Sequence, residues 1–122
     1  MGTWMITVNI LGQKWTIEKK KYDEDETFDR TSCDGYCDGW QRKIVICDMS
    51  TYKGWEHEEP ESIAQCEKLT LRHEIIHAYL DDCGLQDSTM SCNAWAKNEE
   101  MIDWLATIGP QIYQTWKEAD AL

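Results

Sequence analysis

The sequence predicts an α+β domain with a small three-stranded antiparallel or mixed sheet and two long helices. Short segments of alternating apolar residues fill the N-terminal part of the chain. Two later segments have helical length and contain no internal Gly or Pro. Strands followed by helices are typical of this class. Because no repeat and no linker divides the 122 residues, we expect a single domain over residues 1–122.

The first two predicted strands form a β-hairpin. Apolar and more polar residues alternate in residues 5–11 and again in residues 14–20, which is the pattern of half-buried strands. The apolar positions are Ile6, Val8 and Ile10 in the first segment and Trp15 and Ile17 in the second. Gly12 lies between the two segments and suits a tight turn.

A long connection follows, from Tyr22 to Trp40. It contains the acidic run of residues 23–26 and the pairs Asp34-Gly35 and Asp38-Gly39, whose composition is typical of turns. The third strand is predicted over residues 43–47, where Ile44, Val45 and Ile46 are consecutive. Residues 48–59 are polar and predict a second connection.

The first long helix is predicted from about Pro60 to Cys83. Pro60 suits the first turn of a helix, and Gly84 suits a left-handed cap after its end. We predict an apolar stripe on this helix that shares its face with two histidines. The members of that face are Leu69, His73, Ile76, His77 and Leu80.

The second long helix is predicted from about Ser91 to Ile108, with an end at Gly109-Pro110. Its apolar stripe contains Trp95, Ile102 and Ala106. A short last helix is expected from Pro110 through Trp116.

The charge and cysteine content exclude some classes of protein. A formal net charge of -11 would repel phosphate backbones, so nucleic-acid binding is not expected. No stretch approaches the roughly 18 consecutive apolar residues of a membrane span, so no membrane association is expected. The six cysteines lack an accompanying secretion signal, which predicts a cytoplasmic protein with mostly free thiols.

The segment His73-Glu74-Ile75-Ile76-His77 carries the strongest functional pattern. Histidines four residues apart stack on one face of a helix, so both imidazoles can bind one zinc ion. Glu74 is rotated by about 100° from His73 around the helix axis, beside the metal instead of on it. Zinc lowers the pKa of its water, and Glu74 would act as general base and pass the proton to the leaving amine.

The next helix offers the third zinc ligand. Glu99 shares the apolar stripe of that helix, so its carboxylate is expected to point inward. Glu100 is the alternative ligand, because an error of one residue in the helix boundary exchanges the two. Asp103 lies one turn further and is suited to orient a ligand imidazole. Zn²⁺ fits these ligand types best, although similar sets bind iron or nickel.

The pattern His73-Glu74-x-x-His77 followed by Glu99-x-x-x-Asp103 resembles the gluzincin metallopeptidases. The run from Glu99 to Ala106 in particular is similar to the corresponding helix of the ImmA/IrrE-like anti-repressor peptidases and their compact prophage-encoded relatives. The likeness covers most of the chain and implies a minimal zincin, with the sheet packed on the active-site helix and an edge strand that pairs with extended substrate. It also implies cleavage of a protein or peptide, for example a phage repressor, in the cytoplasm of a bacterial host.

Two other hypotheses stay open at this point. In the first, the zinc site belongs to a binding protein without catalytic activity, such as a phage factor that sequesters a host or phage regulator. In the second, the chain is a metal-free interaction domain. For the peptidase, Tyr79, Tyr113 and His57 are the side chains available to donate to a developing oxyanion.

Overall fold

The computed structural model describes residues 4–84 and 99–122, apart from the side chains of four residues in the last helix: Glu99, Ile102, Asp103 and Ala106. The chain forms an α+β fold. In order, its elements are β1 (Trp4–Ile10), β2 (Gln13–Lys20), the short 3₁₀ helix η1 (Tyr22–Glu24), α1 (Thr27–Arg30), β3 (Gly35–Asp38), β4 (Lys43–Cys47), η2 (Met49–Thr51), α2 (Pro60–Asp82) and α3 (Glu99–Glu118).

The sheet is mixed, and its strands lie in the order β1-β2-β4-β3. The predicted hairpin is confirmed, because β1 and β2 are antiparallel. Its two turn residues, Leu11 and Gly12, have φ angles of 51° and 82°, as in the type I′ turns that suit twisted hairpins. The predicted strand at residues 43–47 is also confirmed, and it pairs in parallel with β2.

The prediction of three strands is wrong, because residues 35–38 form a fourth strand, β3, antiparallel to β4. The pairs Asp34-Gly35 and Asp38-Gly39 were predicted to form turns. In the structure, Gly35 and Gly39 instead allow this segment to approach α2 closely. A Cβ atom on Gly35 would lie 2.6 Å from Thr70 Cγ2, and one on Gly39 would lie 1.4 Å from Asp81 Oδ2. Packing against α2 therefore explains both glycines.

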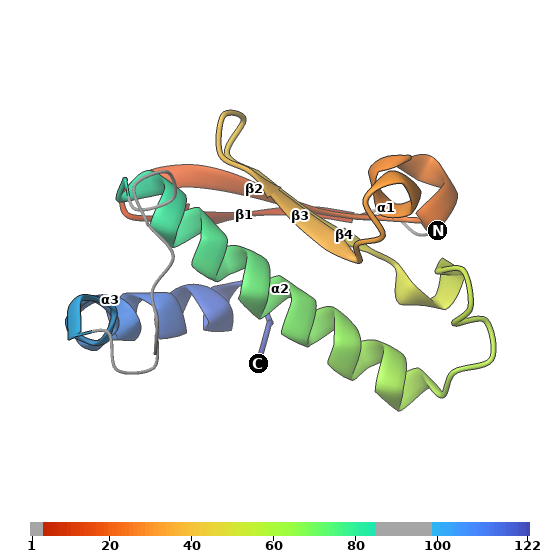
Figure 1. Cartoon of the computed structure of the whole chain (residues 1–122). Helices are drawn as coiled ribbons and strands as arrows, with labels where there is room; N and C mark the ends of the chain where they lie inside the picture. The colour runs from red at the N-terminus through yellow and green to blue at the C-terminus, as the bar shows by residue number, and fades with distance from the viewer. Residues whose placement is uncertain (1–3, 85–98) are drawn as a thin grey trace.

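The helices α2 and α3 cover one face of the sheet (Figure 1). α2 lies mainly against β3 and β4, whereas α3 lies against β1. The core between these layers is formed by Val8, Ile10, Trp15, Ile17, Ile44 and Ile46 from the sheet, and by Leu71, Ile75, Ala78, Tyr79 and Ile112 from the helices. In the described part of the chain, no helix is both long enough and apolar enough to span a membrane.

α2 has the predicted bounds to within one residue, and Gly84 has the expected positive φ of 83°. Its predicted apolar stripe is wrong. Leu69 is 60 % exposed, and the side chains that enter the core are Leu71, Ile75, Ala78 and Tyr79, on nearly the opposite side of the helix. The two histidines are therefore outside the core packing, on a face that a ligand can reach.

α3 continues through Gly109-Pro110, where the prediction placed its end and the start of a separate helix. Gly109 has no Cβ to clash with the proline ring, which relieves the usual restriction on the residue before proline. Pro110 removes one backbone hydrogen bond, and α3 visibly bends along its length (Figure 1). The predicted start at Ser91 and the position of Trp95 lie outside the described residues.

Candidate metal site and substrate groove

His73 and His77 lie together on the accessible face of α2. Their Nε2 atoms are 3.2 Å apart, and their ring centroids are 4.8 Å apart. Two nitrogens that each bind a tetrahedral zinc at about 2.0–2.1 Å are about 3.3–3.4 Å from one another. The two imidazoles therefore already have the separation that a shared zinc ion requires.

Glu74 lies between these histidines and the core. Its side chain is 7 % exposed, and no Lys or Arg of the described residues forms an ion pair with it. Burial, with a smaller contribution from the negative charge of Asp34, raises the pKa of the Glu74 carboxyl to about 7. A carboxylate with this pKa accepts and returns a proton readily near neutral pH.

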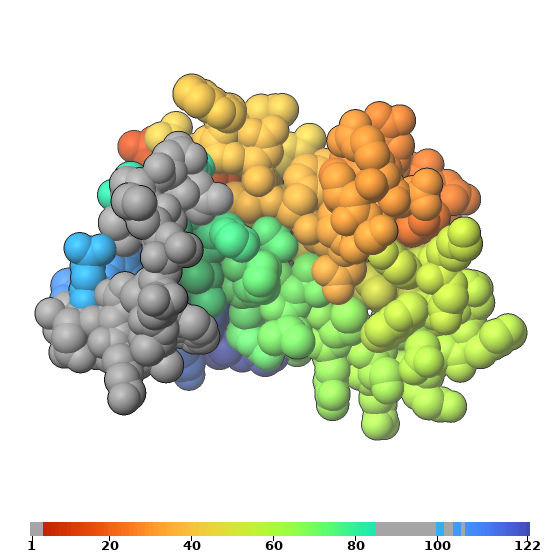
Figure 2. Space-filling view, in the orientation of Figure 1, coloured from red at the N-terminus to blue at the C-terminus, as the bar shows by residue number. Residues whose placement is uncertain are grey.

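A groove runs between α2 and the edge strand β3. One cavity of about 300 Å³ is lined by Gly35, Tyr36, Cys37, Gly39, Glu74, His77 and Asp81. A second cavity of about 380 Å³ is lined by residues 32–35 and by Leu69, Thr70, His73 and Glu74. Glu74 borders both cavities, so the buried carboxylate lies at the middle of the groove. Figure 2 shows the middle of α2, in green, below the orange atoms that precede and include β3.

The strand register determines which backbone groups of β3 face the groove. The Cys47 N–H donates to the Asp34 carbonyl at 2.9 Å, and Tyr36 is the next hydrogen-bonded position on β3. Gly35 and Cys37 fall between these positions. Their N–H and C=O groups therefore point away from β4 and toward the open edge of the sheet. Among the described residues, no strand lies on that side of β3, so an extended peptide could pair its own backbone with these donors and acceptors.

The third predicted ligand, Glu99, is the first residue of α3, and its side chain is not described. The same holds for the side chain of Asp103. Glu100, the alternative ligand, is exposed. Within the described residues, no three His, Cys, Asp or Glu side chains gather as a potential metal site. The structure thus places the two imidazoles beside each other, with Glu74 sharing one cavity with each of them, and leaves the third ligand as a prediction.

The three residues named as oxyanion donors do not line the groove. Tyr79 is 1 % exposed, and its hydroxyl is hydrogen-bonded with Thr115 Oγ1 at 2.7 Å and to the Gln111 carbonyl at 3.0 Å. Tyr113 is exposed on α3, and His57 is exposed in the loop before α2. Neither of the described cavities beside Glu74 contains any of them.

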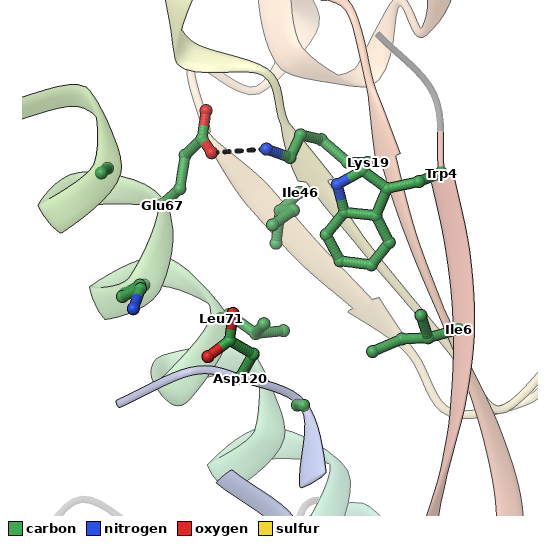
Figure 3. A pocket seen from close by; sticks show the side chains of 10 residues that line it. Trp4, Ile6, Lys19, Ile46, Glu67, Leu71 and Asp120 are labelled. Atoms are coloured by element: carbon green, nitrogen blue, oxygen red, sulfur yellow. Dashed lines mark hydrogen bonds and ion pairs between the residues drawn. The ribbon is translucent and has the colours of Figure 1, made fainter. Parts of the chain in front are cut away.

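A separate cavity of about 350 Å³ lies on the other side of α2, toward β1 (Figure 3). Its walls are mostly apolar, with Trp4 and Ile6 opposite Leu71. The ion pair between Lys19 Nζ and Glu67 Oε1, at 2.7 Å, crosses one end of it. This cavity contains neither histidine of α2, so the candidate chemistry belongs to the groove.

Sequence patterns missed the groove residues supplied by β3, including Gly35 and Cys37, because the strand has only four residues and two of them, Gly35 and Asp38, belong to Asp-Gly pairs typical of turns. Comparisons of the chain with protein-family models, curated proteins and solved structures gave no match. The arrangement of side chains in the groove is therefore the basis for assigning a function.

Proposed function

We propose that this protein is a zinc-dependent peptidase that cleaves a peptide bond in a protein or peptide partner. His73 and His77 would supply two zinc ligands and Glu99 the third. The observation that carries the proposal is the 3.2 Å separation of the two imidazole Nε2 atoms on the face of α2 beside Glu74, whose side chain is only 7 % exposed. Carboxylates are seldom buried without an ion-pair partner, and no Lys or Arg in the described part of the chain pairs with Glu74.

Each part of the groove has a role in this chemistry. Bound zinc would make water more acidic and polarise the carbonyl that is attacked. Glu74 would accept the proton of the attacking water and deliver it to the leaving nitrogen as the C–N bond breaks. The low exposure of Glu74 supports this role, because its proton affinity is raised by burial.

The open edge of β3 supports an extended peptide as substrate. Gly35 and Cys37 present backbone donors and acceptors on the same side as Glu74 and His77. A peptide that added to this edge as a further strand would place its own backbone across the groove. The scissile bond would then lie above the Glu74 carboxylate.

The zinc content of the purified protein is the first test of the proposal. We expect about one zinc per chain in the wild-type protein by elemental analysis, and its loss in His77→Ala. His57→Ala is the matched control, because His57 is the remaining histidine of the chain and is exposed in a loop. No zinc in the wild-type protein after reconstitution would refute the proposal.

The variant Glu74→Gln separates a peptidase from a binding protein with the same metal site. It preserves the size of the side chain and removes the proton acceptor. We expect it to retain zinc and to lose cleavage by a factor of about 10² or more. Retention of full activity by Glu74→Gln would exclude the proposed role of this residue.

A further inference from the structure

We propose that Asp34 forms a subsite that binds a Lys or Arg side chain of the substrate, in the cavity shared by His73 and Glu74. This inference rests on the proposed peptidase function and names the substrate feature that the groove selects. The cavity has a volume of about 380 Å³ and opens beside the first histidine of the candidate metal site.

The carboxylate of Asp34, the residue directly before β3, is held in place by α2. Its Oδ2 atom accepts hydrogen bonds from Thr70 Oγ1 at 3.1 Å and from Cys66 Sγ at 3.7 Å, both on α2. Its backbone carbonyl accepts from Cys47 N–H at 2.9 Å. The backbone and the carboxylate of Asp34 are therefore both held in place before any substrate binds, which lowers the entropic cost of forming an ion pair.

The charges that line this cavity are acidic. Asp34 and Glu74 supply carboxylates, His73 supplies an imidazole, and no Lys or Arg is among the lining residues. No described residue forms an ion pair with Asp34. A substrate cation would compensate this carboxylate, whose Oδ1 atom receives none of the hydrogen bonds described above.

The remaining wall of the cavity fits the stem of a long basic side chain. Leu69 lines the cavity and is 60 % exposed. Lys and Arg side chains pack their methylene groups on such apolar surface while their charged heads reach a polar partner. Asp34 is the residue directly before β3. A peptide paired with Gly35 at the edge of this strand would therefore carry one of its side chains toward Asp34.

The test uses a mixture of proteome peptides cut after Glu, so that Lys and Arg remain inside the peptides. The zinc-loaded wild-type protein and Glu74→Gln are incubated with this mixture, and new termini are identified by mass spectrometry. Among cleavages that depend on Glu74, we expect Lys or Arg to be enriched at one fixed position relative to the cut. A synthetic peptide from the best site is then compared with its Lys→norleucine analogue.

We expect the wild-type protein to prefer the Lys peptide over the norleucine peptide by roughly tenfold in kcat/KM. Asp34→Asn should lower this ratio to near one, while its carboxamide oxygen can still accept from Thr70. Leu69→Lys should lower the ratio too, at an exposed position where folding is not at risk. Asp23→Asn removes the same charge from an exposed site on η1 and should leave the ratio unchanged.

The outcomes distinguish the subsite from the proposed activity. Glu74-dependent cleavage without a basic preference, or a ratio that Asp34→Asn and Leu69→Lys leave unchanged, overturns the subsite and leaves the peptidase intact. Absence of any Glu74-dependent cleavage by zinc-loaded protein overturns both.

Discussion

Replacing Glu74 by Gln should stabilise the metal-free protein at neutral and alkaline pH. The Glu74 carboxyl is 7 % exposed, and burial raises its pKa from the usual 4.5 to about 7. A raised carboxyl pKa means that the folded state binds the proton more tightly than the unfolded state does. The contribution of Glu74 to stability is then highest at low pH and falls as pH rises from about 4.5 to 7.

The size of the effect follows from the shift. A pKa difference of one corresponds to about 1.4 kcal/mol, so the rise from 4.5 to about 7 corresponds to at most about 3.5 kcal/mol. Gln is neutral at every pH and avoids this loss. We therefore expect metal-free Glu74→Gln to exceed the wild-type protein by up to about 3 kcal/mol in free energy of unfolding at pH 8, and to be similar to it near pH 4.5.

Urea unfolding followed by tryptophan fluorescence, with a chelator present, measures this difference between pH 4.5 and 8. Glu58→Gln is a suitable control, because Glu58 is exposed in the loop before α2. Its unfolding should follow the wild-type protein at each pH. A wild-type protein that is as stable as Glu74→Gln at pH 8 would show that the carboxylate is better solvated than the structure indicates.

Three further predictions concern the elements around the groove. Gly35→Ala should lower stability by about 1–3 kcal/mol in urea unfolding, because the added Cβ would lie 2.6 Å from Thr70 Cγ2 and 3.2 Å from the backbone carbonyl oxygen of Val45; an unchanged midpoint would contradict the close approach of β3 to α2. Trp15→Phe should cost about 1–3 kcal/mol by the same assay, since it removes the buried indole N–H that donates to Asp82 Oδ2 at 2.7 Å. Trp40→Ala should change the unfolding free energy by less than about 0.5 kcal/mol, because the Trp40 side chain is 99 % exposed. A larger loss of stability would mean that the indole contacts another part of the protein.

Local patterns were sufficient to predict most of the secondary structure. The alternation around Trp15 and the run Ile44-Val45-Ile46 identified strands, and Pro60 and Gly84 marked both limits of α2. These features depend on neighbours in the chain, so they are visible without tertiary contacts. The end predicted at Gly109-Pro110 failed because packing of α3 against β1 and α2 outweighs one missing hydrogen bond.

The face of α2 that enters the core was not predictable from its composition. Apolar residues occur all round this helix, and the stripe through Leu69 and Leu80 was as apolar as the one through Leu71 and Ile75. Only the position of the sheet decides between them, because burial depends on what lies opposite each side chain. The histidines were correctly assigned to one face, since their spacing of four residues is a local property.

Local sequence patterns were enough to predict the α+β class, to select His73, Glu74 and His77 as candidates, and to place these three residues along one helix. Three features became visible only in the folded chain: residues 35–38 form an edge strand, Glu74 is buried, and Asp34 lies in the same cavity as His73 and Glu74. The reason is physical: helix periodicity places side chains that are close in sequence, whereas a groove is formed by segments that meet only when the chain folds.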